Sequence, residues 1–371
     1  MRKYLILILI LLLVCTLSHQ LEANSFITAE SAILIDAKTG QILYRKNIYQ
    51  PRPPASTTKI MTGILAIETG DLNSKVTTSL QAAHEGGSSI YLKEGETLSL
   101  EELIYGLLVK SGNDAAIAIA QHIGGSVEDF AAMMNFKAQQ IGAKNTNFKN
   151  PNGLPQEGHL TTAYDLAQIA RYALENDFFA QVVATPKKRI SWPEHSWDRI
   201  LKNTNKLLTR TDFVTGVKTG YTRAAGRCLV ASAAKDGREL ISVVLKSNQL
   251  WQDSLNLLNY GFDNFTKETV IEKGAVLKEV EVAEEKINLR AAKGFSEIVM
   301  RGEELKLRKE IECKDDLNLP VLKGQKVGEV TLYTSDNKVR AKIDLLADKG
   351  VALAKGIRLW QKIIRGIQTY F

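Results

Sequence analysis

A serine and a lysine three residues apart, Ser56 and Lys59, open a predicted helix early in the chain. Pro53 and Pro54 come just before the pair and cannot lie inside a helix, so the helix should begin near Ser56 and run to Gly70. Residues three apart share one face of a helix, with Cβ atoms about 5–6 Å apart. A neutral lysine amine at that distance can take the serine proton, and a serine needs such a base to act as a nucleophile.

On its own such a pair is common, and in most chains it is a helix-capping serine and a surface lysine. Two later motifs weigh against that alternative, Ser111-Gly112-Asn113 and Lys218-Thr219-Gly220. Each is weak alone, since the first is typical of a loop at a helix end and the second of a turn. In this order, however, Ser-x-x-Lys, Ser-x-Asn and Lys-Thr-Gly form the pattern of serine β-lactamases and penicillin-binding proteins.

From about Ala32 to Phe265 the chain resembles the low-molecular-mass D-alanyl-D-alanine carboxypeptidases, serine peptidases of family S11 that trim peptidoglycan stem peptides. The stretches that carry the resemblance are Ser56–Thr62, Lys110–Ala116, Asn150–Pro155, Thr162–Ala167 and Gly216–Thr222. The resemblance implies an α+β fold, the penicillin-recognising serine enzyme (β-lactamase/transpeptidase-like) domain, in which an antiparallel sheet packs against a helical cluster. It also implies a small all-β domain after this region and a C-terminal amphipathic helix.

The resemblance assigns catalytic roles to three residues. Ser56 would be the nucleophile, which forms an acyl-enzyme with the penultimate D-alanine of the stem peptide. Lys59 would be the general base, which requires a lowered pKa. Ser111 would pass the proton to the leaving D-alanine, and the backbone N–H groups of Ser56 and Tyr221 would hold the oxyanion.

The resemblance assigns substrate binding to five further residues. Asn113 would orient the lysine base and hold a substrate amide. Lys218 would supply positive charge, both to lower the pKa of Lys59 and to attract the terminal carboxylate of the substrate. Thr219 would bind the terminal carboxylate. Gly220 would leave room for the substrate to lie antiparallel to the strand, and Tyr221 follows it on the same strand.

One position departs from the pattern of some relatives, which carry an arginine after the strand that follows Lys-Thr-Gly. This chain reads Leu245-Lys246-Ser247-Asn248 there. Lys246 and Arg223 are the alternative sources of the missing positive charge.

Local sequence patterns predict the elements of the catalytic region. Runs at 32–35 and 41–44 predict a hairpin, and those at 214–222, 228–233 and 240–245 predict antiparallel strands. Ser99 and Glu102 form a capping box before a helix expected to carry Ser111 and Asn113 at its end. A further helix is expected from Trp251 to Phe265.

The chain is expected to divide into four segments. Residues 1–23 are predicted to be a signal peptide, because Arg2 and Lys3 precede a short apolar stretch; an uncleaved signal anchor is the alternative. Residues 24–265 form the catalytic domain and 266–349 a small β-sandwich-like domain, where apolar residues alternate with charged ones at 280–282, 305–307, 330–332 and 339–343. Residues 350–371 form an amphipathic membrane-anchor helix.

The last segment carries two opposed faces. Its apolar face consists of Leu353, Ile357, Trp360, Ile364, Ile367 and Phe371, and its basic face of Lys355, Arg358, Lys362 and Arg365. This pattern predicts a helix that lies in a membrane surface. The alternative is a helix that packs its apolar face on its own protein.

Composition leaves few other functions. The net charge of +7 favours an anionic neighbour, but basic residues do not interleave with aromatic ones before the C-terminus, so nucleic acid is not an expected partner. The histidines are scattered without metal-ligand spacing, so neither a metal nor a cofactor is expected. His159 is predicted to be a solvated loop residue, and Cys228 a small core residue.

Three functions compete. A serine D-Ala-D-Ala carboxypeptidase, exported and attached to the outer face of the cell membrane, would act on stem peptides ending in D-Ala-D-Ala and be inhibited by β-lactam antibiotics; endopeptidase activity is a variant of it. A β-lactamase would need a glutamate-held water, and Glu157 stands in the wrong context for it. A non-enzymatic wall-binding protein would not need the intact Ser56, Lys59 and Lys218.

Overall fold

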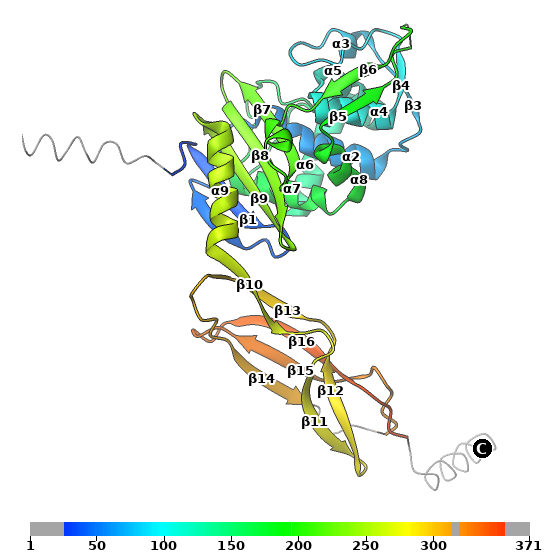
Figure 1. Cartoon of the computed structure of the whole chain (residues 1–371). Helices are drawn as coiled ribbons and strands as arrows, with labels where there is room; N and C mark the ends of the chain where they lie inside the picture. The colour runs from blue at the N-terminus through cyan, green and yellow to red at the C-terminus, as the bar shows by residue number, and fades with distance from the viewer. Residues whose placement is uncertain (1–25, 194, 314–318, 353–371) are drawn as a thin grey trace, which may run out of the picture. The chain divides into compact units, whose positions relative to one another are not determined.

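The computed structural model describes residues 26–193, 195–313 and 319–352, which form two compact units that divide between Asp263 and Asn264 (Figure 1). The predicted signal peptide, and the predicted anchor helix from residue 353 onward, lie outside these ranges. Within them, no helix combines the length and the apolar character that crossing a membrane requires.

The first unit is built on an antiparallel sheet with the strand order β2-β1-β9-β8-β7. Its strands are β1 (Ser31–Asp36), β2 (Ile42–Lys46), β7 (Val214–Thr222), β8 (Gly226–Lys235) and β9 (Arg238–Ser247). The predicted hairpin and the three predicted strands are therefore confirmed. Since β1 pairs with β9, both ends of the unit meet in one sheet.

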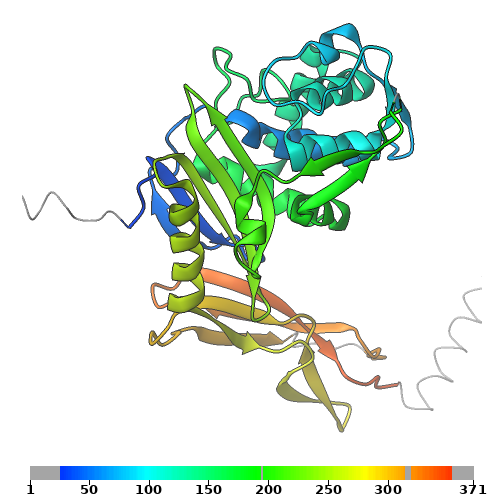
Figure 2. The same cartoon turned by 45° about the horizontal axis from the view of Figure 1, so that its top comes forward.

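Helices cover both faces of this sheet (Figure 2). They are η1 (Ala55–Thr58), α2 (Lys59–Thr69), α3 (Leu80–Ala83), α4 (Leu100–Tyr105), η2 (Gly106–Lys110), α5 (Asn113–Gly124), α6 (Val127–Ile141), α7 (Ala163–Leu174), α8 (Asp177–Ala184), η3 (Lys206–Thr209) and α9 (Leu250–Asn264). The α7 and α8 side carries the main core, to which Ile33 and Ile35 contribute. The alternate residue Leu34 contacts Gly261 of α9 on the other face.

Two short hairpins complete the first unit. They are β3 (Lys75–Thr77) with β4 (Thr97–Ser99), and β5 (Lys187–Ile190) with β6 (Arg199–Lys202). The Ser99–Glu102 capping box is present at the start of α4. The helix that follows differs from the prediction: it continues through η2 to Ser111, where the backbone turns left-handed (φ 69°), and Asn113 begins α5 instead of ending the same helix.

The second unit is all-β, as predicted. Strands β10 (Phe265–Ile271) and β13 (Phe295–Met300) pair, and β11 (Val276–Val282), β12 (Glu285–Ala291), β16 (Val339–Ala347), β15 (Lys326–Tyr333) and β14 (Arg308–Cys313) form a five-stranded sheet. Alternate residues such as Val330 and Leu332 fill its core. Leu305 and Leu307 lie outside the strands, before β14, so that part of the alternation was too short to define a strand.

Candidate active site

Ser56 lies in a strained turn ahead of helix α2. Ala55 adopts a left-handed backbone (φ 50°), which is unusual for a residue with a side chain. Thr57 holds the turn closed, since both its N–H and its hydroxyl donate to Pro54 O, at 3.3 and 2.7 Å. Such a conformation costs about 1–3 kcal/mol and persists where surrounding contacts fix it.

Lys59 is the buried partner of this serine. Its side chain is fully buried, and its Nζ lies 3.1 Å from Ser56 Oγ. The same nitrogen donates to Asn113 Oδ1 at 2.7 Å and to the backbone O of Asn152 at 2.6 Å. A neutral amine satisfies both acceptors with its two N–H groups, and its lone pair then faces the serine hydroxyl.

The surroundings favour that neutral form. Burial lowers the pKa of Lys59 well below its ordinary value, and the positive charge of Lys218 lowers it further, against the carboxylates of Asp114 and Glu85. Lys218 is itself buried on β7 and donates from Nζ to Thr219 O at 3.0 Å. Burial lowers the pKa of Lys218 to about 7.

Asn113 is held from the loop that precedes β4. Its Nδ2 donates to Gly86 O at 2.6 Å, and its backbone N–H donates to Ser88 O at 2.7 Å. Gly87 has a left-handed backbone (φ 87°), and a Cβ atom there would come within 2.7 Å of Asn113 Nδ2. This amide is therefore fixed with its oxygen toward Lys59.

Strand β7 borders the site on the side opposite the loop that holds Asn113. The predicted site residues Thr219, Gly220 and Tyr221 follow Lys218 along it, and Thr219 Oγ1 lies 2.7 Å from Thr204 Oγ1. A Cβ atom on Gly220 would come within 3.0 Å of Ser56 N, so only glycine allows this strand to approach the serine turn so closely.

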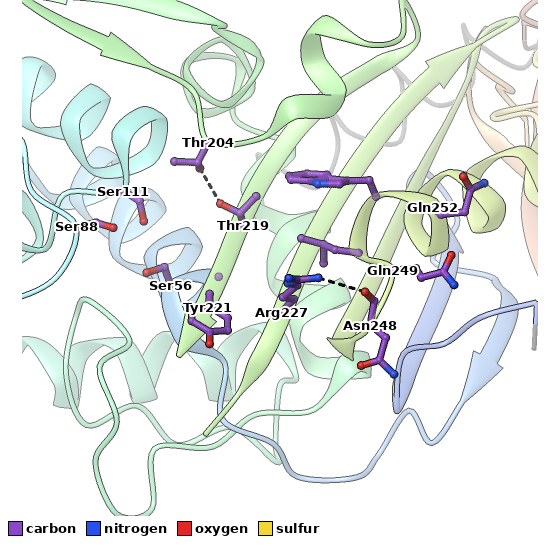
Figure 3. A pocket seen from close by; sticks show the side chains of 13 residues that line it. Ser56, Ser88, Ser111, Thr204, Thr219, Tyr221, Arg227, Asn248, Gln249 and Gln252 are labelled. Atoms are coloured by element: carbon purple, nitrogen blue, oxygen red, sulfur yellow. Dashed lines mark hydrogen bonds between the residues drawn. The ribbon is translucent and has the colours of Figure 1, made fainter. Parts of the chain in front are cut away.

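These walls enclose an open cavity of about 850 Å³ (Figure 3). It is lined by Ser56, Ser88, Ser111, Thr204, Thr219, Gly220, Tyr221, Arg227, Asn248, Gln249, Leu250, Trp251 and Gln252. Five of the eight residues predicted from the sequence are on this lining, and the other three, Lys59, Asn113 and Lys218, lie buried next to them. The structure therefore brings all eight together.

Several residues of the site lie outside the motifs that predict it. Asn152 stands in a stretch that carried the resemblance, but its carbonyl contact with Lys59 could not be read from the motif. Thr204 comes from the segment after β6, where no motif exists. Arg227 had a usable signal, because a strand pair closed by the turn after Thr222 puts it opposite Tyr221.

Neither candidate for the missing positive charge lines the cavity. Lys246 is exposed and forms an ion pair with Glu30 at 2.8 Å, and Arg223 is exposed in the turn between β7 and β8. Neither residue is therefore among the described residues that line this cavity, and the structure gives neither alternative support. Arg227 is the cationic residue on the described lining.

The prediction for His159 is also wrong. The residue is only 3% exposed, because the 150–159 loop folds back onto η1. Its Nδ1 accepts from Lys149 N at 3.0 Å, so Nε2 carries the proton and donates to Thr58 Oγ1 at 2.9 Å. Burial lowers the pKa of His159 to about 4.

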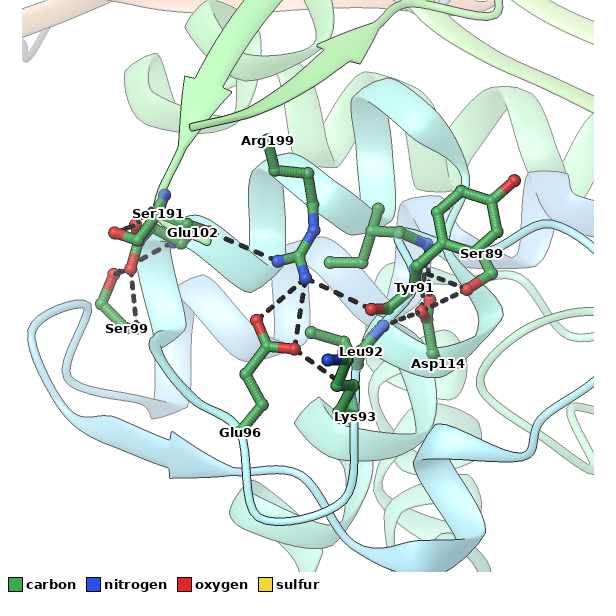
Figure 4. A network of polar contacts seen from close by, with 11 residues as sticks. Ser89, Tyr91, Leu92, Lys93, Glu96, Ser99, Glu102, Asp114, Ser191 and Arg199 are labelled. Carbon is green, nitrogen blue, oxygen red and sulfur yellow. Dashed lines mark hydrogen bonds and ion pairs between the residues drawn. The ribbon is translucent and has the colours of Figure 1, made fainter. Parts of the chain in front are cut away.

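A buried polar network fixes the loop that borders the cavity near Ser88 (Figure 4). The carboxylate of Asp114 accepts from Ser89 Oγ, Ile90 N and Leu92 N. Farther along the loop, Arg199 forms a buried ion pair with Glu96 at 2.9 Å. These contacts hold the loop from α5 on one side and from β6 on the other.

Metal chemistry finds no support in the part of the chain that the structure describes, where His, Cys, Asp and Glu do not gather in groups of three or more. Cys228 is buried in the core, as expected, and Cys313 is half-buried in the other unit; both are free thiols. Burial raises the pKa of Cys228 to about 11, which suits a core residue and not a nucleophile.

An antiparallel sheet against a helical cluster, with a serine and a buried lysine between them, defines a serine enzyme of the penicillin-recognising class. Sequence comparison agrees: the D-alanyl-D-alanine carboxypeptidase family profile matches residues 18–249, and the profile of the penicillin-binding protein 5 C-terminal domain matches residues 265–352. The chain belongs to the D-alanyl-D-alanine carboxypeptidase family. The predicted family is confirmed, and so is the α+β fold with its C-terminal all-β domain; the C-terminal helix of that prediction lies outside the described residues.

Individual relatives cover most of the chain. The D-alanyl-D-alanine carboxypeptidase DacF of Bacillus subtilis is 37% identical, over 85% of this chain and 86% of its own. DacD of Escherichia coli is 34% identical, over 84% of each. The crystal structure of penicillin-binding protein 5 from Haemophilus influenzae superposes with a TM-score of 0.71 and 29% identity, over 88% of this chain and 98% of that one.

Proposed function

We propose that this protein is a serine D-Ala-D-Ala carboxypeptidase that removes the terminal D-alanine from peptidoglycan stem pentapeptides and is acylated by penicillins. The observation that carries the proposal is the 3.1 Å approach of Lys59 Nζ to Ser56 Oγ, with both remaining contacts of Nζ made to acceptors. The names of the relatives agree with it.

Acylation begins when the Ser56 hydroxyl gives its proton to neutral Lys59 and its oxygen attacks the carbonyl of the penultimate D-alanine. The N–H groups of Ser56 and Tyr221 receive the oxyanion, next to Gly220. The C–N bond then breaks, and the leaving amine takes the proton from Lys59 through Ser111. Water hydrolyses the ester and restores the serine.

The remaining site residues bind the substrate in this proposal. Asn113 orients Lys59 and offers its amide to the peptide. Lys218 contributes charge, and Thr219 bonds the terminal carboxylate. The peptide lies along β7 as an added antiparallel strand, whose backbone Gly220 leaves accessible.

A β-lactamase is the second candidate, and the lining of the cavity argues against it. No carboxylate is among the described residues that line the Ser56 cavity. Glu157 lines a separate hollow of about 280 Å³ together with His159. A glutamate-held water for rapid deacylation therefore has no evident place, and the penicilloyl adduct should last minutes or longer.

The test is release of D-alanine from a pentapeptide ending in D-Ala-D-Ala. The wild-type protein should release it and should be labelled by a fluorescent penicillin. Ser56→Ala should abolish both, with a rate loss on the order of 10⁴–10⁶, and Lys59→Ala should be nearly as damaging. Labelling that persists in Ser56→Ala, or penicillin hydrolysed in large excess over protein, would reject the assignment.

We also propose that the enzyme works outside the cell, after removal of residues 1–23, as a catalytic domain (24–265) and a β-domain (266–349) attached to the membrane by a helix at 350–371. Family members act on peptidoglycan, which supports an extracytoplasmic location. The anchor rests on the sequence pattern alone. Each basic residue near an anionic surface adds about 1 kcal/mol.

Truncation after Ala352 tests the anchor. The mature full-length protein should pellet with anionic vesicles, and the truncated protein should stay soluble with unchanged activity on small peptides. Pelleting of both, or of neither, would contradict the anchor and leave the carboxypeptidase proposal intact.

A further inference from the structure

The Arg227 side chain lies where it can contact a ligand bound along β7. It pairs with Tyr221 in the β7–β8 register, and Leu229 pairs with Thr219. Side chains directly opposite in an antiparallel pair lie on the same face, as do residues two apart in one strand. Arg227 therefore shares the face of Thr219 and Tyr221, and it lines the cavity that contains Ser56.

The spacing of Thr219, Tyr221 and the neighbouring strand fits a ligand the size of one amino-acid residue. Thr219 and Tyr221 lie about 7 Å apart along the strand, and neighbouring strands are about 5 Å apart. Figure 3 shows the Arg227 side chain on the neighbouring strand, with Ser56 on the opposite side of β7. The last residue of a peptide whose reacting carbonyl lies at Ser56 would extend over Thr219 toward Arg227.

The guanidinium has donors to spare. Among the described residues it makes one hydrogen bond, from Nη1 to Asn248 O at 3.3 Å, and arginine carries five N–H donors. That bond steadies the side chain at the edge of the cavity. The remaining N–H groups match the two oxygens of a carboxylate, which arginine binds in a bidentate manner.

Permanent charge is what the other cation near the cavity lacks. Burial lowers the pKa of Lys218 to about 7, and its Nζ is already 3.0 Å from Thr219 O. Near neutral pH its charge is incomplete, whereas arginine side chains in general keep their charge.

We propose that Arg227 is a specificity-determining residue, whose guanidinium binds the C-terminal carboxylate of the peptide together with the Thr219 hydroxyl. The inference rests on the proposed carboxypeptidase function and adds the group that makes the enzyme prefer a free chain end. The positive charge that binds the substrate carboxylate would then come from strand β8, and not from Lys246 or Arg223.

The experiment compares two substrates that differ only in this carboxylate. Diacetyl-L-Lys-D-Ala-D-Ala and its C-terminal carboxamide are given to the wild-type protein and to the variants Arg227→Gln and Arg227→Lys, and release of D-alanine or D-alaninamide is measured as kcat/KM. Loss of one hydrogen-bonded charge should lower kcat/KM for the free acid by about 10–100-fold. For the amide the change should stay below about threefold.

For Arg227→Lys, kcat/KM for the free acid should lie between the values of the wild-type protein and Arg227→Gln, because lysine keeps the charge and loses the planar fork. Arg223→Gln is the matched control: it removes the same charge from the exposed turn and should leave both rates unchanged. Circular dichroism and the melting temperature check that each variant is folded.

Each outcome decides. If Arg227→Gln lowers the rates for both substrates equally, or changes neither, the inference is wrong while the carboxypeptidase function stands. If the wild-type protein releases neither D-alanine from the free acid nor D-alaninamide from the amide, the proposed function fails, and the inference fails with it. The inference is supported only if Arg227→Gln loses the preference for the free acid over the amide.

Discussion

Ser56 and Gly220 lie so close that a Cβ atom on Gly220 would come within 3.0 Å of Ser56 N and 3.1 Å of Pro54 O. The nucleophile turn and the substrate-binding strand therefore meet backbone to backbone. The Ser56 N–H, one of the two proposed oxyanion donors, is positioned by a contact in which no side chain can intervene.

Gly220→Ala should slow acylation about tenfold or more, because a shift of a fraction of an ångström at reacting groups is costly. The measurement is the second-order rate of labelling by a fluorescent penicillin. The added methyl group would press against Ser56 N, Ala55 Cβ and Pro54 O, so the melting temperature should fall as well, and the folded fraction is checked before the rates are compared. An unchanged labelling rate would show that the strand can move away without harm.

Lys218→Gln should shift the pH dependence of acylation. Acylation needs neutral Lys59, so its rate rises as pH increases through the pKa of Lys59. Burial is the first cause of the lowered pKa and the charge of Lys218 the second, so removal of that charge should raise the pKa of Lys59. The acidic limb of the rate profile, measured by penicillin labelling between pH 5 and 10, should move to higher pH.

Glu85→Gln should move the same limb in the opposite direction. Glu85 Oε1 accepts from Asn152 Nδ2 at 2.7 Å, and its charge raises the pKa of Lys59. Glutamine keeps the acceptor and removes the charge, so the limb should move to lower pH. Glu85→Ala also removes the hydrogen bond and should lower the plateau rate, because Asn152 holds Lys59. Shifts of the same sign for Glu85→Gln and Lys218→Gln would contradict this electrostatic account.

His159 should make stability fall with acid. Its pKa is about 4 when folded and 6.5 as the reference value, so below pH 6.5 the unfolded chain binds the proton first. Folding stability should therefore decrease as pH falls from 6.5 toward 4, by about 3 kcal/mol at the end of that range. Unfolding midpoints at several pH values measure this dependence.

His159→Gln should flatten that dependence, although it also weakens the fold at neutral pH by about 1–3 kcal/mol through altered hydrogen bonds. His84→Gln, at an exposed histidine, is the control and should leave the slope unchanged. A slope in His159→Gln as steep as in the wild-type protein would place the titrating group elsewhere.

The sequence by itself determined the features that depend on neighbours in the chain. The spacing of Ser56 and Lys59 puts them on one helical face. The Ser99–Glu102 capping box defines the start of α4 through contacts within the helix itself. The apolar runs at 228–233 and 240–245 are short and are flanked by glycine or charged residues, which favours strands over helices. Because these patterns depend only on nearby residues, they can be interpreted without knowledge of the fold.

Only the tertiary structure decided which distant groups complete the site. Asn152 O reaches Lys59 across 93 residues of chain, and Asn113 reaches it across 54. His159 is buried because its loop closes over η1, and Arg227 faces the cavity because β8 pairs with β7 in one register. Burial and charge at these positions arise from packing between elements, and a one-dimensional pattern does not contain the distances that set them.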